Sequence, residues 1–79
     1  PDPAEIEADL RLPRLSRLLV EQRLVMMGYP PGRIDGDFDR ETRRALRRFQ
    51  RDYGLPETGF LTEEALELLI PGGLRRLLE

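Results

Sequence analysis

The chain has 79 residues, of which 39% are hydrophobic and 35% charged, enough for one domain with a modest core. Its 13 basic residues, all of them arginine, and 15 acidic residues give a net charge of −2, without the overall positive field of a general nucleic-acid binder. Neither cysteine nor histidine occurs, which excludes disulfides, cysteine-based zinc sites and a histidine general base.

Residues 1–13 form a predicted N-terminal arm, which combines two early prolines with acidic residues around Ile6, Leu10 and Leu12. We expect this arm to be partly helical. Because the chain begins Pro-Asp-Pro without a methionine, we expect it to be a piece of a longer protein. No apolar run approaches the roughly 18 residues of a membrane span, so we expect no membrane insertion.

The first core helix is predicted from about Pro13 to Met27, where Gly28 and two prolines end it. On a helical wheel this segment is apolar on two opposite faces. One face holds Val20, Leu24 and Met27, and the other holds Leu15, Leu18, Leu19, Val25 and Met26.

A helix that is apolar on both sides needs cover on both sides. The arm and the tail can supply the second cover through Ile6, Leu10, Leu74, Leu77 and Leu78. Alternatively, the second face is an interface with a partner protein or a second copy of the chain.

Residues 28–38 are predicted to form a turn-rich loop, because they include three glycines and two prolines. Tyr29, Ile34 and Phe38 are expected to anchor this loop. The aspartates at positions 35, 37 and 39 resemble the start of an EF-hand loop, but its sixth and twelfth positions are arginine and leucine in place of glycine and glutamate. We therefore expect no metal site.

Asp39 is expected to cap a second helix over residues 40–52. The helical spacing of its apolar residues predicts that Phe49 and Tyr53 lie in the core, together with Phe38 of the loop. The outer faces carry six arginines, which are typical of a solvated face paired with nearby acids. Alternatively, Arg43 or Arg47 contacts an anionic ligand.

The third core helix is predicted from the capping residue Thr62 to about Ile70, so that the central domain spans residues 14–70. Residues 71–79 form a predicted tail with a short further helical segment.

Several short motifs occur in a fixed order between about residues 17 and 70, although none is diagnostic singly. They comprise Leu24, Gly28, Tyr29, Ile34, Asp35, Gly36, Phe38, Thr42, Ala45, Leu46, Phe49, Gln50, Gly54, Leu55, Pro56, Thr58, Gly59, Leu61, Thr62 and Leu66. Together they resemble the bacterial peptidoglycan-binding domain of the three-helix type. The chain departs from that pattern at Asp39 and Arg40, where the family usually has glycine and proline, and at Glu21, where it commonly has glutamine.

The resemblance implies an all-α, mostly right-angled three-helix bundle that anchors a larger protein of the cell envelope, periplasmic or secreted, to peptidoglycan. We predict a shallow groove between the 28–38 loop and the second helix. Its candidate ligand contacts are Tyr29, Asp35, Gly36, Asp37, Arg43, Arg47 and Gln50.

Two of these candidates have alternative roles. Tyr29 either stacks on a sugar or packs against the domain. Gln50 either binds an N-acetyl group or braces a loop.

The acids lie on predicted turns and outer helix faces, without the enclosing cleft that a pair of catalytic carboxylates requires. We therefore expect no enzymatic activity and no cofactor. The alternative function is a docking or oligomerisation module that keeps the fold and uses the second apolar face of the first core helix.

Overall fold

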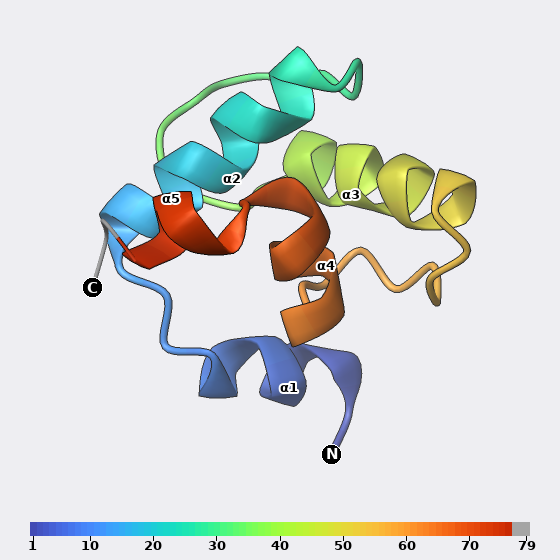
Figure 1. Cartoon of the computed structure of the whole chain (residues 1–79). Coiled ribbons are helices and arrows are strands. Elements are labelled where there is room, and N and C mark those ends of the chain that lie inside the picture. The colour runs from blue at the N-terminus through green and yellow to red at the C-terminus, as the bar shows by residue number, and fades with distance from the viewer. Residues whose placement is uncertain (77–79) are drawn as a thin grey trace.

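The computed structural model describes residues 1–76, except for the side chains at positions 73 and 75. These residues form five helices: α1 (Pro3–Asp9), α2 (Arg14–Met26), α3 (Arg40–Asp52), α4 (Glu63–Leu69) and α5 (Gly72–Arg76) (Figure 1). Within the described residues there is no strand, and no helix is long and apolar enough to cross a membrane. The predicted all-α fold is therefore confirmed, with a helix in both the arm and the tail.

Side chains at the helix starts explain why α3 and α4 begin where they do. The Asp39 carboxylate accepts a hydrogen bond from the Thr42 N–H at 3.1 Å, and the Thr62 hydroxyl accepts one from the Ala65 N–H at 3.1 Å. Each bond satisfies a backbone donor that has no partner within its own helix.

The ends of α2 and α3 share one hydrogen-bond pattern. Beyond α2, the Tyr29 N–H donates to the Leu24 carbonyl at 2.8 Å, and beyond α3 the Leu55 N–H donates to the Gln50 carbonyl at the same distance. A glycine with positive φ precedes the donor in both cases, which is the Schellman arrangement. Both loops therefore leave their helices in a fixed direction.

The core lies where α2 packs against α3 and α4. It includes Leu24 of α2, Leu46 and Phe49 of α3, and Leu66 of α4, which are at most 1% exposed. This layer fixes the relative positions of the two loops that connect the helices.

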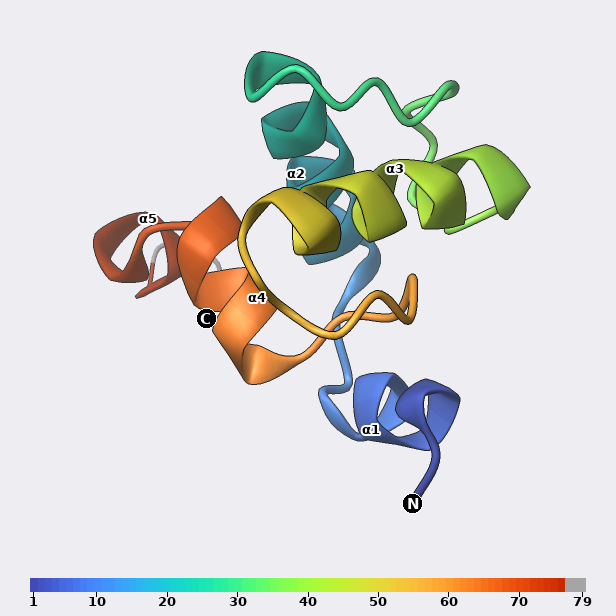
Figure 2. The same cartoon turned by 90° about the vertical axis from the view of Figure 1, so that its right-hand side faces the viewer.

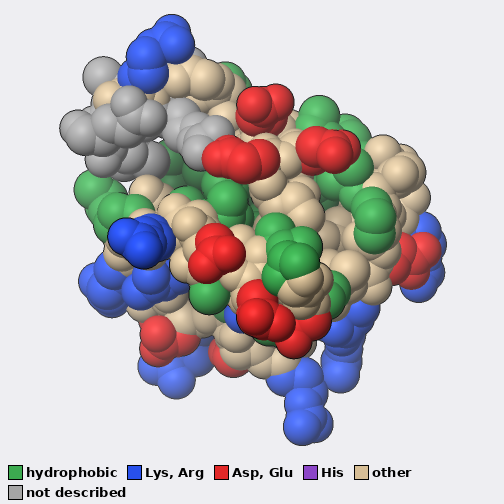
Figure 3. All heavy atoms as spheres, turned by 90° about the horizontal axis from the view of Figure 1, so that it is seen from below, with side chains coloured by type: hydrophobic (Ala, Val, Ile, Leu, Met, Phe, Trp, Pro, Cys, Tyr) green, Lys and Arg blue, Asp and Glu red, His purple; other side chains and the backbone are tan. Residues whose placement is uncertain are grey.

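The five helices are not equally embedded. Figures 1 and 2 show α2, α3 and α4 crossing one another in the centre, while α1 lies at one end of the molecule. None of the residues of α1 is buried. Figure 3 views the molecule from the side on which α1 lies and shows acidic and hydrophobic side chains intermixed across its middle, with arginines toward its rim.

Two predictions about apolar side chains are wrong. Tyr53 is 45% exposed because it lies at the C-cap of α3, where its ring covers Phe49 from outside with ring centroids 4.6 Å apart. Ile34 is 41% exposed, so it does not anchor the 28–38 loop. Phe38 and Tyr29 are half-buried and pack against the core.

The second apolar face of α2 is partly covered by the chain itself. Leu18 and Leu19 are half-buried, and Leu19 packs against the core. The assignment of this face to a protein interface stays a prediction. Leu15, Val25 and Met26 remain exposed. In the arm, Leu10 packs against the core and Ile6 stays exposed. Leu74 is also exposed, while Leu77 and Leu78 lie outside the described residues.

Candidate functional site

A buried carboxylate of α2 holds the 28–38 loop through a hydrogen bond to its backbone. Glu21 of α2 has no exposed surface, and its Oε1 accepts a hydrogen bond from the Gly36 N–H at 2.6 Å. The Thr42 hydroxyl oxygen lies 3.5 Å from its Oε2. Burial raises the pKa of Glu21, since the charged form loses its water, and the bond from Gly36 opposes that shift. Glu21 is thus a brace beneath the loop and not part of a ligand surface.

Two arginines of α2 also hold the loop, through its backbone carbonyl groups. The Arg17 Nε donates to the Gly36 carbonyl at 2.7 Å, and the Arg14 Nη2 donates to the Asp35 carbonyl at 3.1 Å. A β-carbon at Gly36 would lie 2.9 Å from Arg14 Cγ, and φ is +84° there, so the turn requires glycine. Gly36 is buried with both backbone polar groups engaged, and its assignment as a ligand contact is therefore wrong.

A second buried side chain braces the loop between α3 and α4. Gln50 is 1% exposed. Its Oε1 accepts from the Gly59 N–H at 2.8 Å, and its Nε2 donates to the Phe60 carbonyl at 2.9 Å. Of the two roles that the sequence allows, the structure supports loop bracing, because the amide is buried and both of its ends are occupied. The prediction that Gln50 binds an N-acetyl group is wrong.

Tyr29 ties the start of the 28–38 loop to the end of α3. Its hydroxyl donates to Asp52 Oδ2 at 2.6 Å, and its ring meets Phe49 edge-on with centroids 5.8 Å apart. The hydrogen bond to the Asp52 carboxylate is the main cause that raises the pKa of Tyr29 to about 12. Tyr29 therefore packs against the C-terminal end of α3.

Asp35 and Asp37 lie at the other end of the loop. The Asp35 carboxylate accepts from the Asp37 N–H at 2.9 Å, and the Asp37 side chain is exposed. Because this turn adjoins the N-terminal turns of α2 and α3, the structure does not bring these aspartates together with Tyr29. Among the described residues, no group of three or more acidic side chains converges as a metal site.

Arg43 and Arg47 meet at the loop between α3 and α4, and only Arg43 also contacts the end of the 28–38 loop, at Phe38. The Arg43 Nη1 donates to the Gly59 carbonyl at 3.2 Å, and a β-carbon at Gly59 would lie 2.8 Å from Arg47 Nη1. The predicted groove between the 28–38 loop and α3 is therefore not formed by these arginines.

Arg43 is the centre of a cluster that the sequence did not predict. Glu7 of α1 accepts hydrogen bonds from both terminal nitrogens of Arg43 and from the Leu61 N–H, at 2.5, 2.9 and 2.7 Å. The guanidinium carbon lies 4.2 Å from the ring centroid of Phe60 and 5.2 Å from that of Phe38. Glu7 is separated from Arg43 by 36 positions, so no local spacing could have revealed the pair.

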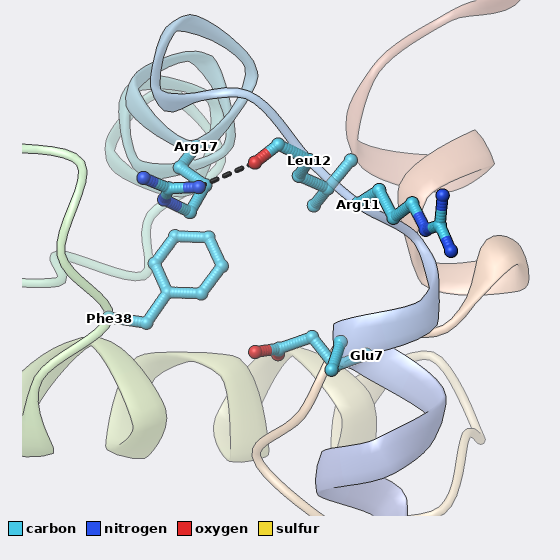
Figure 4. A pocket seen from close by; sticks show the side chains of 6 residues that line it. Glu7, Arg11, Leu12, Arg17 and Phe38 are labelled. Atoms are coloured by element: carbon cyan, nitrogen blue, oxygen red, sulfur yellow. Dashed lines mark hydrogen bonds between the residues drawn. The ribbon is translucent and has the colours of Figure 1, made fainter.

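A pocket of about 260 Å³ lies beside this cluster (Figure 4). It is lined by Glu7, Ala8, Arg11, Leu12, Arg17 and Phe38. Figure 4 shows Arg17 and Glu7 on opposite sides of the Phe38 ring, with the Arg11 side chain directed away. The arm thus supplies most of the residues that line this pocket. The groove predicted from the sequence involves only residues of the central domain, so it does not include this pocket.

The fold and these braced loops define a small helical module in which buried polar side chains hold two loops in place. Residues 14–69 match a family model described as "Putative peptidoglycan binding domain". The chain belongs to this family, as its sequence motifs predicted.

Comparison with solved structures supports the same relationship. Two crystal structures of SltB3 from Pseudomonas aeruginosa, one in complex with NAG-anhNAM-pentapeptide and one with NAG-NAM-pentapeptide, are each 34% identical to this chain with a TM-score of 0.68. Each match covers 71% of this chain and only 15% of the SltB3 chain. A comparison with curated proteins found no match.

Proposed function

We propose that this domain binds peptidoglycan without chemistry of its own and anchors a larger protein of the cell envelope to the wall. The observation that carries the proposal is the family match over residues 14–69, together with a shared fold in SltB3, whose structures hold peptidoglycan fragments with a pentapeptide. The spanned 15% of SltB3 is the size of an accessory domain, which favours a similar role within a longer chain.

The geometry favours a binding role. Glu21 and Gln50 hold both loops rigid from within, so polar groups on the loops and on α3 are presented at fixed positions. A preorganised surface loses less conformational entropy when it binds a ligand. Single contacts on so small a surface give weak binding, which attachment to a larger protein or several contacts on one polymer can strengthen.

Co-sedimentation with purified peptidoglycan sacculi tests the proposal, with microcrystalline cellulose as a control for non-specific pelleting. We expect the chain to sediment with sacculi in a saturable way and to stay in the supernatant with cellulose. Equal recovery with both polymers, or none with sacculi, would contradict the proposal.

A second candidate function is docking through α2, and a specific observation favours it. Leu15 and Met26 are 62% and 64% exposed, and Val25 is 43% exposed. Sedimentation velocity of the wild type and of the Leu15→Glu/Met26→Glu variant tests this candidate. Docking between copies predicts a concentration-dependent dimer that the variant loses, whereas a wild-type monomer at every concentration would eliminate docking between copies.

A further inference from the structure

Residues of the core domain contact Arg43 independently of the arm. Its guanidinium faces the rings of Phe60 and Phe38, and its Nη1 donates to the Gly59 carbonyl at 3.2 Å. The arm contributes none of these contacts. A guanidinium fixed in this way keeps its two terminal nitrogens directed at one point, which suits two-point recognition of a carboxylate.

A carboxylate already occupies that point. Glu7 accepts from both terminal nitrogens of Arg43, and one of its oxygens also accepts from the Leu61 N–H at 2.7 Å. Only 15% of the Glu7 side chain and 22% of the Arg43 side chain are exposed. The three donors converge on both oxygens of one carboxylate and are largely shielded from water, which strengthens each bond.

The helix that supplies Glu7 is only weakly embedded. None of the residues of α1 is buried, and Ile6 is 38% exposed. Its capping box joins Asp2 to Glu5 within the helix itself. Leu10 and Leu12, which follow α1, pack against the core and keep the arm attached if the helix leaves. Apart from the contacts of Glu7, therefore, little buried surface opposes the detachment of α1.

We infer that Arg43, the Leu61 N–H and the rings of Phe38 and Phe60 form a carboxylate-binding site, and that Glu7 fills this site until a carboxylate of the ligand displaces it. The pocket of about 260 Å³ continues from Glu7 along Phe38 and offers room beside the site. If the ligand is peptidoglycan, an inference that rests on the proposed function, the matching group is a free carboxylate of the stem peptide.

Occupation by Glu7 lowers the apparent affinity for an external carboxylate in proportion to the time that the site is filled. A variant without the Glu7 charge should therefore bind more tightly than the wild type. Competition of this kind distinguishes a ligand site from a merely structural ion pair, since breaking a structural pair creates no affinity for a ligand.

The test uses the full chain, with N-acetyl-D-alanyl-D-alanine as the probe and its C-terminal carboxamide as the matched control. NMR titration follows the backbone amide of Leu61 in the wild type, in Glu7→Gln and in Glu57→Gln, which removes an exposed carboxylate paired with Arg51. We expect Glu7→Gln to bind the probe at least tenfold more tightly than the wild type. Glu57→Gln should match the wild type, and the carboxamide should bind to none of the three.

Two further variants test whether the gain in affinity depends on Arg43 and on the stability of α1. Arg43→Gln added to Glu7→Gln should abolish the gained affinity. Asp2→Ala, which retains Glu7 but removes the α1 cap, should raise the affinity about threefold, because a weaker helix fills the site for less time. Equal affinities of Glu7→Gln and the wild type, or equal binding of the acid and the carboxamide, would overturn the inference.

Retention of the same variants on sacculi distinguishes a failure of the carboxylate site from a failure of the proposed function. Retention of all variants on sacculi, without any effect of Glu7→Gln on probe or sacculi, would overturn the carboxylate site and leave peptidoglycan binding intact. Tighter probe binding by Glu7→Gln, with no retention on sacculi, would support the site and remove its assignment to peptidoglycan.

Discussion

Glu21 places a carboxylate in the core of the domain. Because burial raises its pKa above the ordinary value of 4.5, the folded chain binds a proton there more tightly than the unfolded chain does. Its contribution to stability is therefore fully present below the ordinary pKa and is lost as the pH rises through the raised value.

Glu21→Gln should remove this pH dependence while keeping an oxygen that accepts from the Gly36 N–H. We expect the free energy of unfolding of the variant, relative to the wild type, to increase from about pH 4 to about pH 7. Asp39, whose pKa is lowered chiefly by the hydrogen bond from the Thr42 N–H, has the opposite dependence, but it is present in both chains and cancels in the difference. Urea unfolding followed by circular dichroism measures both curves, and parallel curves would contradict the role given to Glu21.

Gln50 supports the second loop in the same way, with a neutral side chain. Gln50→Ala leaves the Gly59 N–H and the Phe60 carbonyl without their partners, which should lower the free energy of unfolding by about 2–3 kcal/mol. Gln22→Ala on the exposed side of α2 is the control and should change it by less than about 0.5 kcal/mol. Similar urea midpoints for the two variants would show that the buried amide is not a brace.

At the scale of elements, the helices of the core could be predicted because their start and stop signals are local. Asp39, Thr62 and the glycines after α2 and α3 lie at the observed caps, and α3 spans the expected residues 40–52. The site could not be predicted to the same extent. The sequence indicates Arg43 as an anion-binding candidate, but its partner Glu7 is 36 positions away, and their contact depends on how α1 docks.

The same limit applies to the predicted groove. Tyr29 and the turn at Asp35 belong to one short loop, yet this loop runs along α3 and leaves them near opposite ends of that helix. Glycine and aspartate residues predict that a loop turns. They do not predict which backbone groups of the loop are hydrogen-bonded to buried side chains. Glu21 accepts a hydrogen bond from the Gly36 N–H, and Gln50 accepts one from the Gly59 N–H.

Amide hydrogen exchange should show that α1 opens independently of the core. We expect its amides to exchange faster than those of α2 and α3, because α1 has no buried residue. Glu7→Ala should reduce protection in α1 and at the Leu61 amide, which loses its acceptor, but not in α2 or α3. Glu57→Ala, which breaks an exposed ion pair elsewhere, should leave α1 unchanged. Loss of protection throughout the chain on Glu7→Ala would instead make α1 an integral part of the core.

At the scale of the whole molecule, one layer of core side chains fixes the positions of the helices and of both loops. The helices α2, α3 and α4 meet at Leu24, Leu46, Phe49 and Leu66, and this layer fixes where both loops leave the core. On one side of the layer α2 keeps an exposed apolar strip, and on another α1 closes over Arg43. Binding by surfaces that the core holds in place depends on the folded state as a whole.

The most direct measurement is therefore the fraction of chain bound to sacculi across a urea series, beside the helical signal of the same samples. If the folded core presents the binding surface, binding and helical signal should fall with the same urea midpoint. Binding that persists after the helices have unfolded, or that is absent before urea is added, would contradict the account.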